Sequence, residues 1–347
     1  MMKKETKKFQ VPMNDASKDH KDIQKAATLL QAGEVVAFPT ETVYGLGADA
    51  TNNQAIDKIF EAKARPQDNP LIVHIGSKSD VEKYVSDYPF HAKQLVEAFW
   101  PGALTVILPA KDAFARNVTA GLTTVGLRMP DHPVAQAILQ ASDLPIAAPS
   151  ANLSGKPSPI TAEHVLQDLD GRIAAVVDGG PTGVGVESTV VDCTAERPII
   201  LRPGGVTKAD LEEVIGTIDV ADHLLEEADA PRSPGMKYKH YAPDVPIWVI
   251  AGDAPQMALV YEKLIAEGKR VGYMISEERA EALHVNPDIS LGSAENVTEI
   301  TKNIYAHLRA VDQLDVDIVL TESFSKQGIG QALMNRLERA ASEIIID

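Results

Sequence analysis

Residues 144–161 read LPIAAPSANLSGKPSPIT, and this stretch contains both a buried strand and a polar loop. The apolar run 144–148 has the length of a strand, and Pro149 ends it. The serine, asparagine, glycine and proline residues that follow are typical of a loop held in a fixed shape. Hydroxyl, amide and backbone N–H groups bind anions and nucleotides, and open α/β sheets bind ligands at strand ends. The stretch therefore predicts an α/β fold with a ligand-binding loop, and a solvated turn is the alternative.

Predicted strands and helices alternate on both sides of this stretch, up to Gly216. Residues 34–38 and 71–75 are apolar runs of strand length, and residues 53–64 have apolar side chains on one helical face. Several predicted strands follow one another without a helix between them, which favours a mixed sheet over a purely parallel one. Residues 21–216 are therefore expected to form one large α/β domain around a mixed, twisted sheet.

A second, smaller α/β domain is predicted at the C-terminal end. Residues 217–245 are rich in charge, proline and glycine and are too long for an ordinary connection, so a linker or lid loop is expected there. From residue 246 to residue 347 strands and helices alternate regularly, which predicts a doubly wound, Rossmann-like domain with a supporting or regulatory role. Residues 1–20 are polar and lysine-rich, and we expect a flexible N-terminal arm.

Composition excludes several classes of protein. The net charge of −16 argues against a dedicated nucleic-acid binder, which would carry a basic excess. Cys193 is the only cysteine, which excludes an internal disulfide and a thiolate metal cluster. No apolar run reaches the ~20 residues of a membrane span, and the N-terminal residues MMKKETKKFQ contain no signal-peptide core. A cytoplasmic enzyme without membrane association fits best.

Common catalytic motifs are absent from the sequence. There is no G-x-x-x-x-G-K-[ST]; the nearest string, LSGKPS, lacks the leading glycine and has a proline after its lysine. There is also no G-x-S-x-G, no H-E-x-x-H and no pair of C-x-x-C motifs, which argues against a nucleophilic triad and against zinc hydrolysis.

Four cations of the first domain lie in or at the ends of predicted strands and helices: Lys63, Arg65, Arg128 and Arg202. Lys63 and Arg65 end a predicted helix, where the macrodipole alone would favour a cation. Arg128 lies in an apolar strand, and a buried arginine needs a partner, so it faces either an anion or a carboxylate in a structural ion pair. His74 lies inside another strand, where a structural role is the alternative to a catalytic one.

Three motifs, in order along the chain, resemble the YrdC-like threonylcarbamoyl-AMP synthases. Residues 63–71 (KARPQDNPL) resemble the K-x-R…N-P-L signature of that family, and residues 149–161 resemble its S-x-N loop. Residues 233–243 (SPGMKYKHYAP) look like the linker of its longer, two-domain members. The resemblance covers nearly the whole chain after the first ~20 residues.

This resemblance implies a nucleotidyltransferase that makes L-threonylcarbamoyladenylate and pyrophosphate from L-threonine, bicarbonate (or CO2) and ATP. The reaction is adenylyl transfer from ATP to N-carboxy-threonine, the first step of threonylcarbamoyladenosine formation in tRNAs that read codons starting with A. The implied partners are downstream tRNA threonylcarbamoyl-transfer proteins, with room for a weak tRNA contact. Mg²⁺ is expected with ATP, held by phosphates and water, without a dedicated protein metal site or an organic prosthetic group.

The same resemblance assigns roles to individual residues. The implied catalytic residues are Lys63, Arg65, Ser150 and Asn152. The implied ATP-binding residues are Lys63, Asn69, Thr124, Ser150, Ser158, Arg202 and Tyr241, of which the last would close over the nucleotide. The implied L-threonine-binding residues are Thr40, His74, Arg128, Ala148 (through its backbone) and Ser188. Because the reacting groups are anionic, such a site needs cations and hydrogen-bond donors more than a nucleophile.

Three other functions stay open on the sequence alone. An RNA-binding module without its own catalysis would use the same cations to hold a tRNA or double-stranded RNA backbone, with steep salt dependence. A carbamoyltransferase would carry further domains with metal-binding histidines, and the sequence shows none. A nucleotide sensor would bind ATP without turnover.

Overall fold

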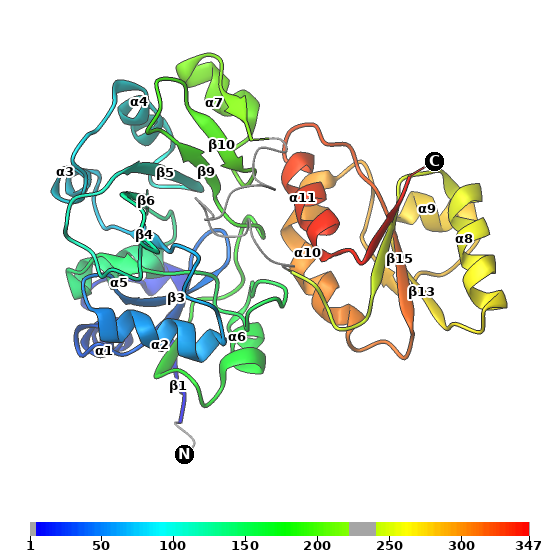
Figure 1. The fold of residues 1–347 in the computed structure, drawn as a ribbon. Helices are drawn as coiled ribbons and strands as arrows, with labels where there is room; N and C mark the ends of the chain where they lie inside the picture. The colour runs from blue at the N-terminus through cyan, green and yellow to red at the C-terminus, as the bar shows by residue number, and fades with distance from the viewer. Residues whose placement is uncertain (1–4, 222–240, 347) are drawn as a thin grey trace. The chain divides into compact units, whose positions relative to one another are not determined.

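A computed structural model describes residues 5–221 and 241–346 of the chain (Figure 1). The described residues form two compact units: unit 1 consists of residues 5–154 and 158–221, and unit 2 of residues 155–157 and 241–346. Most of the predicted linker (residues 222–240) lies outside the described residues. None of the described helices has the length and apolarity that a membrane crossing requires.

Unit 1 is built around one mixed sheet, which confirms the predicted architecture. The order of its eleven described strands is β1-β8-β2-β3-β7-β4-β6-β5-β9-β10-β11. The strands are β1 (Lys7–Gln10), β2 (Val36–Pro39), β3 (Tyr44–Asp49), β4 (Ile72–His74), β5 (Leu104–Pro109), β6 (Thr124–Arg128), β7 (Ile146–Ala147), β8 (Ala175–Asp178), β9 (Thr189–Asp192), β10 (Ile199–Arg202) and β11 (Asp219–Val220). β4 and β6 run parallel, whereas β5 and β6 run antiparallel. β11 lies within the stretch that was predicted to be linker.

The helices of unit 1 pack on this sheet. They are α1 (Lys21–Gln31), α2 (Asn53–Lys63), α3 (Val81–Tyr84), α4 (Phe90–Phe99), α5 (Pro133–Ser142), α6 (Ala162–Leu169) and α7 (Lys208–Ile215), with short 3-10 turns η1 (Met13–Asp15) and η2 (Lys78–Asp80). α2 matters most for the site. The side chain of Asn52 caps its first turn, and Ala64, in the left-handed conformation, ends it directly after Lys63.

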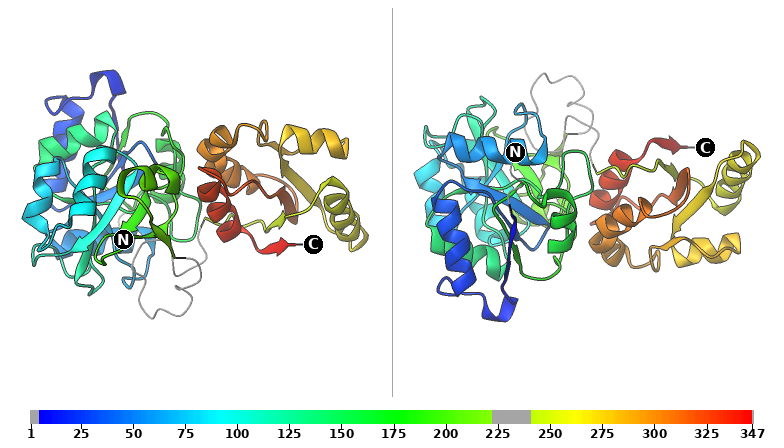
Figure 2. Two further views of the ribbon diagram at one scale, coloured as in Figure 1. Left: turned by 90° about the horizontal axis from the view of Figure 1, so that it is seen from above. Right: turned by 90° about the horizontal axis from the view of Figure 1, so that it is seen from below.

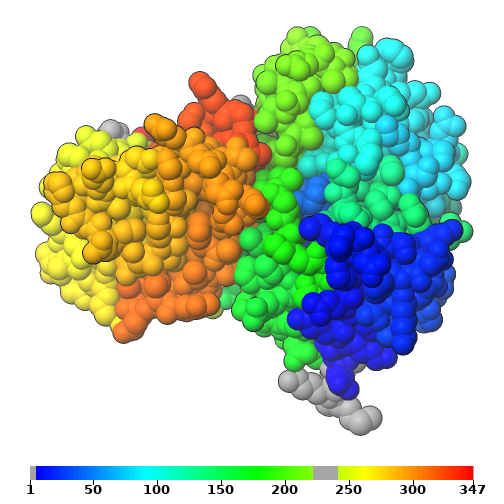
Figure 3. Space-filling model, turned by 180° about the vertical axis from the view of Figure 1, so that it is seen from behind, coloured from blue at the N-terminus to red at the C-terminus, as the bar shows by residue number. Residues whose placement is uncertain are grey.

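The prediction of a flexible N-terminal arm is wrong for residues 5–20. β1 pairs in parallel with β8, and Lys7 lies opposite Ala175. Phe9 and Val11 are buried in the apolar cluster beneath α1 and α5. In the space-filling view this segment lies against the rest of unit 1 (Figure 3). Two apolar side chains at alternate positions are compatible with an edge strand, but they are too few to predict one from the sequence.

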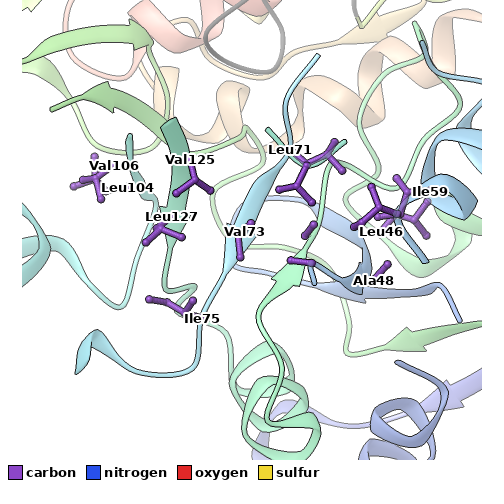
Figure 4. Close-up of a cluster of buried hydrophobic side chains, with 14 of the residues drawn as sticks. Leu46, Ala48, Ile59, Leu71, Val73, Ile75, Leu104, Val106, Val125 and Leu127 are labelled. Carbon is purple, nitrogen blue, oxygen red and sulfur yellow. The ribbon is translucent and has the colours of Figure 1, made fainter. Parts of the chain in front are cut away.

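The main core of unit 1 covers one face of the central strands (Figure 4). Among its labelled side chains, Val73, Leu104, Val106, Val125 and Leu127 come from these strands, and Leu71 and Ile75 directly flank β4. Ile59 of α2 packs into the same cluster. Because side chains alternate along a strand, the residues between these, such as His74 and Arg128, point to the opposite face. The core therefore fixes which face of the sheet is left for a site.

Unit 2 is a small doubly wound α/β fold, as predicted. Its five described strands are all parallel, in the order β14-β13-β15-β12-β16. Helices lie on both faces of this sheet, with α8 and α9 on one and α10 and α11 on the other (Figures 1 and 2). The elements are β12 (Ile247–Ile250), α8 (Ala254–Ala266), β13 (Val271–Ile275), α9 (Glu277–Leu283), β14 (Ile289–Ser290), α10 (Val297–Val311), β15 (Ile318–Glu322), α11 (Gly330–Ala340) and β16 (Glu343–Ile345).

Candidate active site

Lys63 joins the end of α2 to the loop that follows β7. Its side chain is buried, and Nζ donates hydrogen bonds to the backbone oxygens of Ser150 and Asn152, both at 2.5 Å. In return, the N–H of Ser154 donates to the carbonyl of Lys63 at 2.9 Å. A lysine ammonium carries three donors and is costly to bury without partners, so this arrangement holds a cation within the loop. Three of the predicted catalytic residues, Lys63, Ser150 and Asn152, thus lie together.

Arg65 and Asn69 lie in the loop that leads from α2 into β4. The Arg65 guanidinium is half-buried, and its Nη2 lies 3.4 Å from the carbonyl oxygen of Asn69. Asn69 is buried, and its side-chain oxygen Oδ1 has no hydrogen-bond partner among the described residues. A buried polar atom without a partner is uncommon in folded proteins, and a ligand can supply the missing bond. This feature supports Asn69 as a binding residue, which stays a prediction.

Five polar side chains lie near one another on the sheet face opposite the main core. His74 of β4 is directly paired with Arg128 of β6. Thr105 of β5 lies across from Arg128 on its other side, because the next residues, Val106 and Leu127, are paired. The hydroxyls of Thr105 and Ser188 are hydrogen-bonded at 2.8 Å. The backbone carbonyl of Ser188 accepts from Nε and Nη2 of Arg202 at 3.2 and 2.9 Å.

The same sheet face continues into an apolar patch. Ile72, Ile107 and Val190 pack together there. They line a small hollow together with Thr105 and Thr124, the latter a predicted ATP-binding residue. The sequence analysis did not single out Thr105, although its alternation with buried residues in the run LTVIL indicates which face it occupies. This sheet face thus has a polar end with His74 and an apolar end, which Thr124 borders.

Arg128 forms an ion pair with Glu41 that is largely shielded from solvent. Its Nη2 donates to Oε1 of Glu41 at 2.6 Å, and the two side chains are only 5% and 14% exposed. Its Nε donates to the carbonyl oxygen of Gly102 at 3.2 Å. The structural ion pair that the sequence analysis left open is therefore present. The sequence analysis did not identify Glu41 as the partner of Arg128. The available signal was that a buried arginine requires a partner such as a carboxylate.

His74 is kept neutral by its surroundings. Burial, and to a lesser degree the positive charge of Arg128, together lower its pKa to about 3. Its Nδ1 has no hydrogen-bond partner among the described residues. A neutral imidazole can both donate and accept a hydrogen bond, so this ring can orient a ligand without adding charge.

This pKa predicts how the stability of unit 1 depends on pH. The unfolded chain protonates His74 below about 6.5, whereas the folded state does not until the pH approaches about 3. The unfolded state therefore binds more protons in this window, and the free energy of unfolding falls as the pH decreases, by up to about 1.4 kcal/mol per pH unit. His74→Gln is expected to flatten this slope, measured by urea unfolding between pH 4 and pH 7. Equal slopes in the wild type and in His74→Gln would contradict the prediction.

Three further predicted residues of unit 1, Thr40, Ala148 and Ser158, are hydrogen-bonded to other residues of the same unit. Thr40 closes its own turn, since its hydroxyl donates to the carbonyl of Val43 at 2.7 Å. The N–H of Ala148 donates to the carbonyl of Ile72, so a backbone contact from Ala148 to a ligand would have to use its carbonyl oxygen. The hydroxyl of Ser158 donates to a carboxylate oxygen of Glu187 at 2.6 Å, and both residues are buried.

Tyr241 belongs to unit 2. Its ring is buried, with the ring centre of Tyr305 at 5.3 Å and the guanidinium carbon of Arg336 at 5.5 Å. Aromatic and cation–π contacts of this kind hold a ring in a defined orientation. Its predicted contact with ATP stays a prediction.

Known proteins resemble this chain along nearly its full length. The family model described as "Telomere recombination" matches residues 28–204, and that of "Threonylcarbamoyl-AMP synthase, C-terminal domain" matches residues 206–342. The chain is 51% identical to the threonylcarbamoyl-AMP synthase of Bacillus subtilis, over 98% of this chain and 99% of that protein. It is 44% identical to the enzyme of the same name from Pyrococcus abyssi, over 93% and 95% of the two chains. A crystal structure of P. abyssi Sua5 complexed with L-threonine superposes with a TM-score of 0.88 at 41% identity and covers 99% of both chains.

Proposed function

This chain belongs to the threonylcarbamoyl-AMP synthase family in its two-domain form, and from this membership we propose how its own residues carry out the reaction. The enzyme converts L-threonine, bicarbonate (or CO2) and ATP into L-threonylcarbamoyladenylate and pyrophosphate. Adenylyl transfer of this kind makes it a nucleotidyltransferase of tRNA modification. The observation that carries the residue-level proposal is the burial of Lys63, Arg128 and Arg202, only 1%, 4% and 7% exposed, in one unit. Buried cations are rare and suit anionic substrates.

The anionic end of L-threonine binds at the polar end of the sheet face. Arg128 offers its planar guanidinium to the substrate carboxylate, a geometry that favours two parallel hydrogen bonds. Neutral His74 and the hydroxyls of Thr40 and Ser188 surround the amino acid, and the carbonyl of Ala148 accepts a hydrogen bond from it. The P. abyssi structure with bound L-threonine supports this class of ligand.

ATP binds beside the loop that Lys63 holds. Lys63 and Arg202 contact its phosphates, and Asn69, Ser150, Asn152 and Ser158 supply further hydrogen bonds. Thr124 borders the apolar hollow, which suits the flat, weakly polar face of a purine. Arg65 completes the ATP-binding set of unit 1, and Mg²⁺ enters with ATP as part of the substrate, held by phosphates and water.

The chemical step joins two anions, so its main requirement is charge stabilisation. A carbamate oxygen of N-carboxy-threonine attacks the α-phosphorus of ATP; a new O–P bond forms, the bond to the β-phosphate oxygen breaks, and pyrophosphate leaves with the electron pair. Lys63 and Arg202 stabilise the charge that develops on the phosphates. Lys63 is already fixed by two carbonyls and needs little reorganisation at the moment of reaction.

The test is pyrophosphate release by the purified full-length protein with Mg²⁺ and ATP. Release should require both L-threonine and bicarbonate, and L-serine should replace L-threonine poorly. ATP binding without release would refute the reaction and favour a nucleotide sensor. The relatives named above do not support the RNA-binding alternative. That alternative would require strong, steeply salt-dependent RNA binding without any pyrophosphate release. Cytoplasmic localisation, a direct tRNA contact and downstream transfer proteins as partners remain proposals.

A further inference from the structure

The backbone of Glu41 is fixed by two neighbouring segments. It lies in the turn between β2 and β3, where the Thr40 hydroxyl accepts from the N–H groups of Thr42 and Val43 at 3.2 and 3.3 Å. The carbonyl of Glu41 itself accepts from the N–H groups of Gly183 and Val184 at 3.0 and 2.8 Å. The side chain of Glu41 thus projects from a rigid base.

Both oxygens of the Glu41 carboxylate are used. Oε1 accepts from Nη2 of Arg128 at 2.6 Å, and Oε2 accepts from the N–H of Asp131 at 3.0 Å. The carboxylate therefore ties the guanidinium to the loop that follows β6. The Nε of Arg128 is held separately by the carbonyl of Gly102.

The remaining donors of Arg128 are left for a ligand. A guanidinium carries five N–H groups in one plane. Two of them are bonded within the described residues, to Glu41 and Gly102, so three make no such bond there. Since the two bonded donors lie on different nitrogens, the plane of the guanidinium cannot rotate without breaking one of these bonds.

We propose that Glu41 is a positioning residue for L-threonine: it fixes the guanidinium of Arg128 so that its remaining N–H groups meet the substrate carboxylate. This inference rests on the proposed function, which places that carboxylate at Arg128. Glu41 also carries a negative charge near an anionic substrate, which opposes binding. The guanidinium lies between the two carboxylates, so the repulsion acts over a longer distance than the contact that Glu41 orients.

Glu41→Gln tests the proposal in the full-length protein by equilibrium binding of L-threonine and, separately, of ATP with Mg²⁺. The amide keeps the size but loses the charge and one acceptor. L-threonine should bind about 10- to 100-fold more weakly, the loss expected when one hydrogen bond to a charged group is no longer formed. ATP binding should stay at the wild-type level, and Glu41→Asp should recover part of the affinity for L-threonine.

A double-mutant cycle separates positioning from independent contacts. If Glu41 acts through Arg128, adding Glu41→Gln to Arg128→Lys should weaken L-threonine binding no further than Arg128→Lys alone. The matched control is Glu34→Gln, which removes a carboxylate from its pair with Lys58 at 3.0 Å in the same unit and should leave L-threonine binding unchanged.

Three results would overturn the inference. Unchanged or tighter L-threonine binding by Glu41→Gln would show that the ion pair does not assist the substrate. Equal weakening of L-threonine and ATP, together with a lower melting temperature, would show that Glu41 only stabilises the fold. Additive losses in the cycle would show that Glu41 acts apart from Arg128. If the wild-type protein itself fails to bind L-threonine, the proposed function fails, and the inference with it.

Discussion

Replacing Lys63 with alanine is expected to lower pyrophosphate release by about 100- to 1,000-fold, the usual cost of removing one preorganised donor to developing negative charge. The effect has two sources. The ammonium that we place on the ATP phosphates is lost, and the backbone oxygens of Ser150 and Asn152 lose their common donor. The loop that carries Ser150, Asn152 and Ser158 is then free to move. The measurement is the steady-state rate at saturating ATP, L-threonine and bicarbonate.

The control for this variant is Lys58→Ala on the same helix. Lys58 is more exposed and pairs with Glu34, so its removal should leave the rate near that of the wild type. The melting temperatures of both variants show whether the fold survives. Near-normal turnover by a folded Lys63→Ala protein would contradict the phosphate role of Lys63.

The second large effect is expected from Gly204→Ala. A Cβ at this position would overlap the backbone of Glu187, Ser188 and Thr189. Backbone atoms cannot move aside as a flexible side chain would, so either β9 shifts or β10 does. Overpacking of this kind costs about 1–3 kcal/mol and occasionally more, and we expect a loss of about 3 kcal/mol in the free energy of unfolding of unit 1.

Activity should fall as well, because Ser188 holds the Arg202 guanidinium. Urea unfolding and the melting temperature measure the loss of stability. Gly183→Ala is the matched control, since its Cβ would meet only the carbonyl oxygen of Glu41 at 3.7 Å, an ordinary contact. A Gly204→Ala protein as stable as Gly183→Ala would contradict the expected overlap.

The local pattern of the sequence predicted where the strands lie and that Arg128 is a buried cation. It did not predict which strands are neighbours or which carboxylate pairs with Arg128. The apolar run around Arg128 placed it in a buried strand, and burial required a partner. That partner, Glu41, is 87 residues away in sequence, and only the pairing of β4, β6 and their neighbours brings the two together. Register between distant strands depends on the whole core, so it cannot be read from one segment.

In the N-terminal segment, the local sequence pattern did not reveal even the strand itself. Charge and polarity dominated residues 1–20, and the two apolar side chains at Phe9 and Val11 were too few to suggest a strand. An edge strand needs apolar residues only where it meets the core, and polar residues elsewhere keep it from aggregating. The burial of Phe9 and Val11 could be known only once their neighbours in the fold were known.

The pairing of β1 with β8 also has a consequence for the order of events during synthesis. The hydroxyl of Thr6, next to β1, bonds the carbonyl of Ile173, 167 residues later in the chain. At ribosomal speeds of about 5–20 residues per second, the first segment therefore waits roughly 10–30 s after leaving the ribosome before its partner strand exists. During that interval the lysines around Phe9 keep the unpaired strand from aggregating. The polar character of the segment therefore protects the nascent chain as well as the exposed edge of the folded sheet.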